Sequence, residues 1–521
     1  MATKPSHPSS SHHKPNVRMQ QRMSLADPIH GMIQFDRRDE THALLLDIMN
    51  TSAFQRLRRI KQMGLAEFVF PGATHSRFIH SLGAVHLMMK AIEHFNNDPD
   101  TREVLQSTFH LTDTEGSKTD TGISVERLLL VSILIHDIGH TPLSHTLEDI
   151  LELKDRGLSH DHYWNGRILS EDKELCQIWQ KYDPQLPQAL LQFMGEDPPG
   201  QSTKPPGAEQ GYKKRSNKHY LAYLVSSQLD MDRLDYLQRD SHYLGVQYGR
   251  VEAQRIIANL VIAKTPQGQP VIAVREEAIP AIEHYLFGRF QAYKMALHSL
   301  DKASEAILHC VLKRFKAARE EGIDIGHPAN ELYTLMSDGH SLTCQSYLRM
   351  DDCYLWEVLN TWTTDANKDP LLRQLAERMM THDLFKFIDL HKYSQGSHLA
   401  ELGDIVIALR KHYEQRGLSF DFGFEETIVK PKPMYLPPED REPIWISRFR
   451  GPVVDLRNIS SLPLSVVEGQ GHKHLVFVWD KKAKRFLLDQ LEKHFASHGK
   501  HDEHAPDELD LEDEPEENSL I

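Results

Sequence analysis

The 521-residue sequence contains few cysteines and no long apolar run. Its four cysteines, Cys176, Cys310, Cys344 and Cys353, show no CxxC spacing. We therefore expect no disulfide framework, and a reducing compartment fits this composition. No apolar stretch reaches the length of a membrane span, and no signal-peptide core lies near the start. We expect a soluble, cytoplasmic protein with no membrane partner.

The chain also lacks a broad excess of positive charge. Its net charge is -14, but residues 502–517 alone carry ten acidic residues and no Lys or Arg. The rest of the chain is therefore only mildly acidic, which argues against extensive nucleic-acid binding and leaves a local basic groove possible.

What the chain does contain predicts a mainly α fold with a small β-hairpin and a C-terminal α+β module. We expect a disordered N-terminal arm over 1–22, a helical core over 23–320 with a flexible insertion at 195–218, a helical extension over 321–425, the α+β module over 426–497 and a disordered acidic tail over 498–521. The arm and the tail are too polar to form a core.

Hydrophobic periodicity locates the individual elements. Helices are expected at residues 42–49, 54–62, 76–95, 158–169, 220–240, 276–314 and 484–495. Ser76 is placed to cap the helix that follows it. The polar stretch 111–124 predicts a loop, and 261–274 predicts a β-hairpin around a Pro-rich turn.

The most informative segment is 128–148. Between Leu128 and Ile135 only Ser132 is polar, so this helix is expected to be buried on most sides. It ends in His136–Asp137, and a divalent cation would satisfy both side chains in an apolar setting. The turn after Gly139 brings His140 and His145 back toward the same place. The alternative is a capping Asp with histidines that hydrogen-bond in a polar core.

Further candidate ligands lie elsewhere in the chain. His80 shares a helix face with Arg77, a candidate phosphate contact, although His80 could equally be satisfied by a carbonyl. On the predicted helix 220–240, Asp232, Tyr236 and Asp240 lie on one stripe, which ordinary surface salt bridges could also explain. His160, Asp161 and His162 crowd the start of another helix, and at least one is expected to face the cleft.

Together His80, His136, Asp137 and Asp232 offer two imidazoles and two carboxylates. Such a set suits one divalent metal ion, with Mn, Fe, Mg, Ni and Zn all possible. A bound cation would supply hydroxide at neutral pH. Nearby arginines and histidines favour phosphorus as the electrophile.

At this point the sequence resembles the HD-domain phosphohydrolases, and specifically the deoxynucleoside triphosphate (dNTP) triphosphohydrolases, of which the dGTPases are one type. The resemblance rests on DPIHG (27–31), FQRLRRIKQMG (54–64), VFPGATHSRFIHSLG (69–83), HDIGHTPLSH (136–145) and DMDRLDYLQRDSHYLG (230–245). It implies an HD-domain helical core and water attack on the α-phosphorus of a dNTP, giving a deoxynucleoside and triphosphate.

The resemblance also implies roles for single residues. The family's metal ligands are matched by His80, His136, Asp137 and Asp232, and the expected catalytic residues are His140, His145, Glu148 and His160. Its substrate contacts are matched by Arg77, Arg233, Tyr236, Asp240, Gln62 and Met63. A regulatory nucleotide site is expected at Gln55, Arg58 and Asn50. His145 stands in the proton-donor position, and Glu148 where an acid orients that histidine. Leu297 replaces a Tyr common among relatives, which leaves base selectivity open.

The resemblance further implies a dNTP substrate, an activating nucleotide and a homo-oligomer, with dGTP as a candidate preferred substrate. Two other functions remain open. One is an HD phosphohydrolase that acts on another nucleotide or on single-stranded nucleic acid, for which the basic cluster 213–215 is the only support. The other is a nucleotide-sensing scaffold whose C-terminal module binds a partner.

Overall fold

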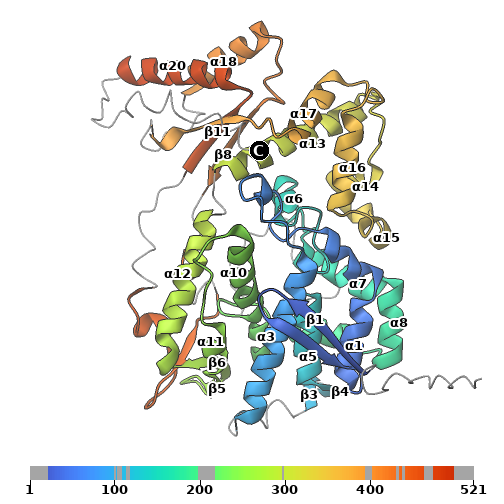
Figure 1. The fold of residues 1–521 in the computed structure, drawn as a ribbon, viewed down its shortest axis with the longest axis vertical. Coiled ribbons are helices and arrows are strands. Elements are labelled where there is room, and N and C mark those ends of the chain that lie inside the picture. The colour runs from blue at the N-terminus through green and yellow to red at the C-terminus, as the bar shows by residue number, and fades with distance from the viewer. Residues whose placement is uncertain are drawn as a thin grey trace, which may run out of the picture.

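A computed structural model describes residues 21–98, 101, 108–112, 118–196, 218–295, 299–392, 402–429, 433–436, 441–462 and 473–497. The fold is mainly α with small sheets, as predicted (Figure 1). Most of the predicted arm 1–22, most of the insertion 195–218, the whole acidic tail and Leu297 lie outside the described residues. None of the helices in the described ranges combines the length and apolarity that a bilayer crossing requires.

The first half of the chain forms a helical body. Its elements in chain order are β1 (Arg22–Asp27), β2 (Gly31–Asp36), α1 (Glu40–Met49), α2 (Ser52–Gln55), the 3-10 helix η2 (Arg56–Arg59), α3 (Arg77–Asn97), β3 (Thr108–Thr112), β4 (Lys118–Ser124), α5 (Val125–Ile135), α6 (His145–Ile150), the π-helix η4 (His160–Trp164), α7 (Asn165–Glu171), α8 (Lys173–Tyr182), α9 (Leu186–Met194), the 3-10 helix η5 (Tyr220–Leu224) and α10 (Met231–Leu244).

The buried helix α5 lies at the centre of this body. Every residue from Leu128 to Ile135 is buried, Ser132 included, as the apolar run predicted. Ser124 caps the helix by accepting a hydrogen bond from the backbone N–H of Arg127. Helix α3 packs along α5 on one side and along α10 on the other, so three segments distant in sequence lie together (Figure 1).

Three local predictions are wrong. The described residues of the stretch 111–124 are not a loop, because 111–112 and 118–124 belong to β3 and β4, which pair in antiparallel fashion. The helix expected over 220–240 is broken: η5 ends at Leu224, and Asp230 starts α10 by accepting hydrogen bonds from the backbone N–H groups of Ser227 and Arg233. Ser76 occupies the N-cap position before α3, but its hydroxyl makes no capping hydrogen bond.

The second half of the chain continues with α11 (Ala253–Ile257), β5 (Leu260–Lys264), β6 (Pro270–Arg275), α12 (Ile279–Met295), α13 (Ser299–Glu320), α14 (Asn330–Asp338), α15 (Cys344–Tyr347), α16 (Asp352–Trp362), α17 (Pro370–Met380), β7 (Lys386–Asp389), α18 (Gly403–Gln415), β8 (Phe424–Val429), β9 (Trp445–Ser447), β10 (Val454–Asp455), β11 (Lys473–Val478) and α20 (Lys481–Ser497). The predicted hairpin is confirmed as β5–β6, and the predicted terminal helix as α20.

Two sheets join parts of the chain that the sequence placed apart. Strand β9 pairs in parallel with β6, giving the order β10-β9-β6-β5. Strand β11 pairs with β7 and β8, and helices α18 and α20 lie at the same end of the molecule as this sheet (Figure 1). Strand pairing therefore crosses the boundary expected at residue 426, and the division of the chain into domains stays a prediction.

Candidate metal centre and the groups around it

The candidate site begins where α5 ends. Ile135 is the last helical residue, and His136 follows as the C-cap. Gly139 then allows a close approach of η4 and α7, because a Cβ there would lie 2.6 Å from Asn165 Oδ1 and 2.9 Å from the His160 carbonyl oxygen. The side chain of Asn165 fixes this turn by donating to the His136 carbonyl and accepting from the Gly139 N–H.

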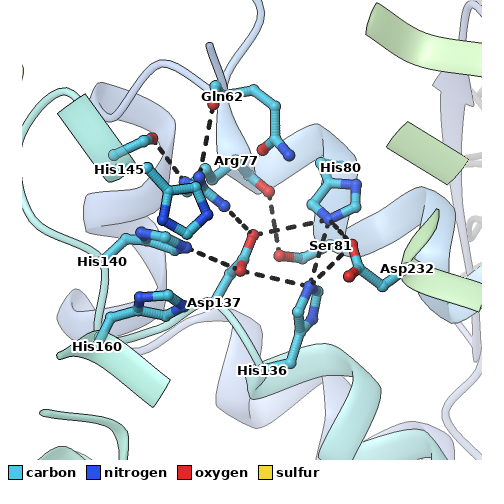
Figure 2. Close-up of polar contacts among 12 residues, drawn as sticks. Gln62, Arg77, His80, Ser81, His136, Asp137, His140, His145, His160 and Asp232 are labelled. Atoms are coloured by element: carbon cyan, nitrogen blue, oxygen red, sulfur yellow. Dashed lines mark hydrogen bonds and ion pairs between the residues drawn. The ribbon is translucent and has the colours of Figure 1, made fainter. Parts of the chain in front are cut away.

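Four side chains from three distant segments meet at this point, as predicted. His80 from α3 and Asp232 from α10 join the pair at the end of α5 (Figure 2). His80 Nε2 lies 3.1 Å from Asp232 Oδ1, 3.3 Å from His136 Nε2 and 3.6 Å from Asp137 Oδ2. Two ligands held at right angles about 2.1 Å from one cation would be about 3 Å apart, so the spacing suits a shared ion.

The hydrogen-bond partners of the two imidazoles support the same interpretation. His80 Nδ1 lies 2.8 Å from the carboxylate of Asp235, and His136 Nδ1 lies 2.7 Å from the carbonyl of Ile133. Both partners only accept hydrogen bonds, so each Nδ1 carries a proton, and loss of the Nε2 proton would leave each ring with a lone pair directed into the cluster. A divalent cation would satisfy these lone pairs together with the carboxylate oxygens. The residues present therefore fit a metal ion.

The electrostatics of the cluster agree. Burial lowers the pKa of His80, but hydrogen bonds to Asp232 and Asp235 outweigh it and raise that pKa to about 10. The pKa of Asp232 is held below its ordinary value, because the two histidines outweigh the effect of burial. The pocket therefore attracts positive charge, whether as protons or as a cation.

Arg77 ties Asp137 to the loop before α6. Its Nη1 donates to Asp137 Oδ2 at 2.6 Å, and its Nε donates to Ser144 Oγ at 2.7 Å. Leu143 and Ser144 both have positive φ, 55° and 59°, which non-glycine residues rarely adopt. Strain of this kind persists only where surrounding contacts impose it, and here those contacts hold the turn between His140 and His145.

A second cluster lies on the far side of Asp137 and contains the predicted catalytic residues. His140 Nε2 is 3.2 Å from Asp137 Oδ1, and its ring stacks on that of His160 at 3.6 Å. Glu148 Oε2 is 3.1 Å from His145 Nδ1 and 2.9 Å from His160 Nδ1. Of the crowded group 160–162, His160 faces this cluster (Figure 2).

The charges in this second cluster are well defined. Burial raises the pKa of Glu148, but hydrogen bonds from His145 and His160 outweigh it and hold that pKa below its ordinary value. Burial, Arg77 and His160 lower the pKa of His140 well below its ordinary range, so its ring is neutral. The carboxylate of Glu148 thus fixes the orientation of His145, whose side chain is 64% exposed and open to a ligand.

The predicted substrate contacts other than Arg77 lie at three positions around the candidate site. Arg233 is hydrogen-bonded to the Tyr236 hydroxyl at 3.0 Å beside Asp232. Asp240, one turn further along α10, accepts a hydrogen bond from His75 Nε2 at 2.8 Å. Gln62 Oε1 is buried without a protein partner, whereas Met63 packs in a small apolar cluster with Ala66, Ala73 and Leu244.

The predicted regulatory residues form a separate group at the end of α1 and in α2–η2. Arg58 Nε donates to Gln55 Oε1 at 2.7 Å, and Gln55 Nε2 donates to the Met49 carbonyl. Asn50 is the exposed C-cap of α1. The structure brings these residues near one another, and their binding of a nucleotide stays a prediction.

Sequence reasoning missed several groups at the site. Asp235, His30 and Arg239 form a fully or largely buried network behind His80. Arg289 and Tyr293 from α12 adjoin Arg233, since the Tyr293 hydroxyl lies 3.2 Å from Arg289 Nε and 3.4 Å from Arg233 Nη1. The one signal for Asp235 was its position three residues after Asp232, which places both on neighbouring parts of one helix.

Comparison with known proteins relates this architecture to phosphohydrolases. No protein-family model matches the chain. It is 28% identical to the uncharacterized protein YwfO of Bacillus subtilis, over 87% of this chain and 91% of that protein. It is 27% identical to the bovine deoxynucleoside triphosphate triphosphohydrolase SAMHD1 over 70% of this chain, a match that spans 58% of the bovine protein.

Solved structures agree with these sequence relatives. A crystal structure described as a phosphohydrolase, BT4208 from Bacteroides thetaiotaomicron, superposes with a TM-score of 0.65 at 28% identity, over 88% of this chain and 99% of that one. A hypothetical protein from Aquifex aeolicus shares the fold at 21% identity and a TM-score of 0.57. The similarities support a relationship to the HD phosphohydrolases and do not single out the dGTPases.

Proposed function

We propose that this protein is a metal-dependent nucleotide phosphohydrolase that cleaves dNTPs to a deoxynucleoside and triphosphate. One observation carries the proposal: two imidazole Nε2 atoms and two carboxylates converge within 3.1–3.6 Å, next to a buried arginine. Similarity to a dNTP triphosphohydrolase and to a structure described as a phosphohydrolase supports the substrate class.

In this proposal His80, His136, Asp137 and Asp232 hold one divalent cation. When bound, such an ion polarises a phosphoryl oxygen and lowers the pKa of water toward neutrality. Arg77 and Arg233 lie beside the cluster and bind phosphate oxygens, for which a guanidinium has suitable geometry. Burial lowers the pKa of Arg233, but Tyr236, Asp230 and Tyr293 outweigh it and raise that pKa well above the ordinary value, so the guanidinium is charged.

The histidine cluster on the other side of Asp137 protonates the leaving group. His145, oriented by ionised Glu148, donates a proton to the leaving 5′-oxygen of the deoxynucleoside once the bond to the α-phosphorus breaks. Neutral His140 and its stacked partner His160 exclude water on that side and contact the phosphate. Asp240, oriented by His75, and Tyr236 bind the sugar 3′-hydroxyl, and Gln62 offers an unpaired buried acceptor nearby.

A product assay tests the proposal. The purified chain, loaded in turn with Mn²⁺, Mg²⁺ and Fe²⁺, is incubated with each of the four dNTPs, and the products are separated by anion exchange. Triphosphate and deoxynucleoside in equal amounts are expected, with dGTP the candidate preferred substrate, and Asp137→Ala should form neither. Orthophosphate or pyrophosphate as the inorganic product would contradict cleavage of the bond between the α-phosphorus and the 5′-oxygen. Cleavage of labelled oligonucleotides in place of dNTPs would favour the nucleic-acid alternative.

A further inference from the structure

The carboxylate of Asp235 lies directly behind the candidate metal centre. Its side chain is fully buried and accepts hydrogen bonds on both oxygens from two histidines on opposite sides. Oδ2 is 2.8 Å from Nδ1 of His80, whose other nitrogen faces the centre. Oδ1 is 2.6 Å from Nε2 of His30, in the turn between β1 and β2. Asp235 therefore bridges a candidate metal ligand and a distant hairpin.

Arg239 holds Asp235 in place and offsets the cost of burying its charged carboxylate. Its Nε and Nη2 donate to the two oxygens of Asp235 at 2.8 and 2.9 Å, and its Nη1 donates to Asp27 Oδ2 at 2.9 Å. Asp27 also accepts hydrogen bonds from the backbone N–H groups of Ile29 and His30. One buried guanidinium thus holds both Asp235 and the turn that carries His30.

The packing of α3 on α10 is built around this carboxylate. Gly83 in α3 faces it, and a Cβ at Gly83 would lie 1.9 Å from Asp235 Oδ1 and 2.3 Å from Arg239 Nη2. No side chain larger than hydrogen fits there without displacing the carboxylate. Glycine is an unfavourable residue inside a helix, so its presence here serves this contact.

We propose that Asp235 is a positioning residue for the metal ligand His80, and that the β1–β2 hairpin is coupled to the metal centre through His30. A carboxylate on Nδ1 keeps the Nε2 lone pair of His80 directed at the cation and makes that nitrogen a stronger ligand. His30 in turn holds the other oxygen of Asp235 in place. The inference rests on the metal centre of the proposed function and is independent of which nucleotide is cleaved.

The coupling is reciprocal. If His30 strengthens binding of the cation, then the cation must stabilise the docked hairpin by the same factor, because linkage between two equilibria is symmetric. Loss of the hairpin contact would weaken the site without removing any ligand. The β1–β2 hairpin, about fifteen residues long, would thereby influence cation binding at the site formed by α3, α5 and α10.

The test is a Mn²⁺ titration of the full-length apo protein, followed by the electron paramagnetic resonance signal of free Mn²⁺. Asp235→Asn is expected to raise the dissociation constant about 10- to 100-fold, as for other carboxylates behind metal-bound histidines. His30→Gln should raise it by a smaller factor. His42→Gln, which removes a histidine packed on Phe35 of the same hairpin, should leave it unchanged.

Hydrogen exchange of residues 22–36 gives a second readout. If His30 only stabilised the fold, Mn²⁺ would not change the exchange rate of the hairpin. Added Mn²⁺ should slow exchange in the hairpin of the wild-type chain and of His42→Gln, and should have no effect on it in His30→Gln. If Asp235→Asn fails to fold, His30→Gln still decides the matter. Wild-type Mn²⁺ affinity in folded Asp235→Asn or His30→Gln would overturn the inference, as would a wild-type chain that takes up no Mn²⁺. A chain that binds Mn²⁺ but cleaves no dNTP would refute the proposed function alone.

Discussion

At the scale of single residues, the candidate cation ligands and the candidate proton donor are different side chains, and they lie in two neighbouring clusters. His145 is 64% exposed and contacts Glu148, and it is not a member of the cluster of His80, His136 and Asp232. Its role can therefore be removed without disturbing the candidate metal ligands.

We predict that His145→Asn lowers kcat about 10²- to 10⁴-fold, the usual contribution of a positioned general acid. Metal content and KM should change little, because His145 is not among the ligands. Steady-state kinetics with the best dNTP and metal analysis of the same sample measure both quantities. His94→Asn is the matched control, since His94 donates to the Leu260 carbonyl at the other end of α3. An unchanged kcat in His145→Asn would rule out this histidine as the proton donor.

A second residue-scale prediction concerns stability and pH. Burial lowers the pKa of His219 to about 4 in the folded chain, against 6.5 for an unperturbed side chain. The folded state therefore binds this proton less tightly than the unfolded state. The stabilisation is complete above pH 6.5 and is lost as the pH falls through 6.5 toward 4.

The variant His219→Gln should lack this dependence. Between pH 6 and 4.5 the unfolding free energy of the wild type should fall more steeply than that of the variant, by up to about 1.4 kcal/mol per pH unit, the value for one proton. Urea unfolding at several pH values provides the measurement. Parallel curves for the two proteins would show that His219 is not the residue responsible.

At the scale of elements, local sequence explains some features well and others poorly. The apolar run in α5 and the carboxyl and imidazole groups at its end were predictable, because helical burial and ligand chemistry are local properties. The break between Leu224 and Asp230 was not, because the buried side chain of Asp230 caps α10 only when the chain turns back on itself. The bridge from His30 to Asp235 spans 205 residues, and no local pattern signals such a contact.

The cap of α5 gives an element-scale prediction. Ser124 is exposed, and its hydroxyl accepts from the Arg127 N–H at 3.2 Å, one helix length away from His136. Ser124→Ala should destabilise the protein by about 1 kcal/mol, as expected for the loss of a capping hydroxyl. Chemical denaturation measures this loss, and kcat should remain at the wild-type value. A fall in kcat with no loss of stability would contradict a purely capping role.

At the scale of the whole molecule, the helical region after residue 320 contacts the turn of the candidate site through hydrogen bonds and ring stacking. Asp352 accepts hydrogen bonds from the backbone N–H groups of Leu143 and Lys61 at 2.7 and 2.9 Å. The Tyr347 hydroxyl donates to the Gly139 carbonyl, and its ring stacks on Trp164 at 3.6 Å. Arg56 links the same two regions by donating to the carbonyls of Met350 and His140.

We predict that Asp352→Ala lowers the unfolding free energy by about 2–5 kcal/mol, because two buried N–H groups lose their acceptor. Activity should fall as well, since the turn from Leu143 to His145 loses a support. Asp365→Ala is the control: that carboxylate is 99% exposed and its ion pair with Arg373 should contribute less than about 1 kcal/mol. Equal stability of the two variants, measured by urea unfolding, would contradict this role for the C-terminal helices.

The sheets show why the long-range organisation was harder to predict than the site. Strands β6 and β9 pair in parallel although α12 to α18 lie between them in the chain, and β7 joins β11 and β8 from a region expected to be helical. Short strands of three to six residues carry little periodicity, and their partners are set by the packing of the finished molecule.

The central claim is that His80, His136, Asp137 and Asp232 together bind one divalent cation. Metal analysis by mass spectrometry of the Mn²⁺-loaded, desalted wild-type chain and of Asp137→Ala tests it most directly. The account predicts about one bound ion per wild-type chain, as four protein ligands at one centre imply, and almost none in the variant, with both proteins folded. Equal metal content in the two proteins, or none in the wild type, would contradict it.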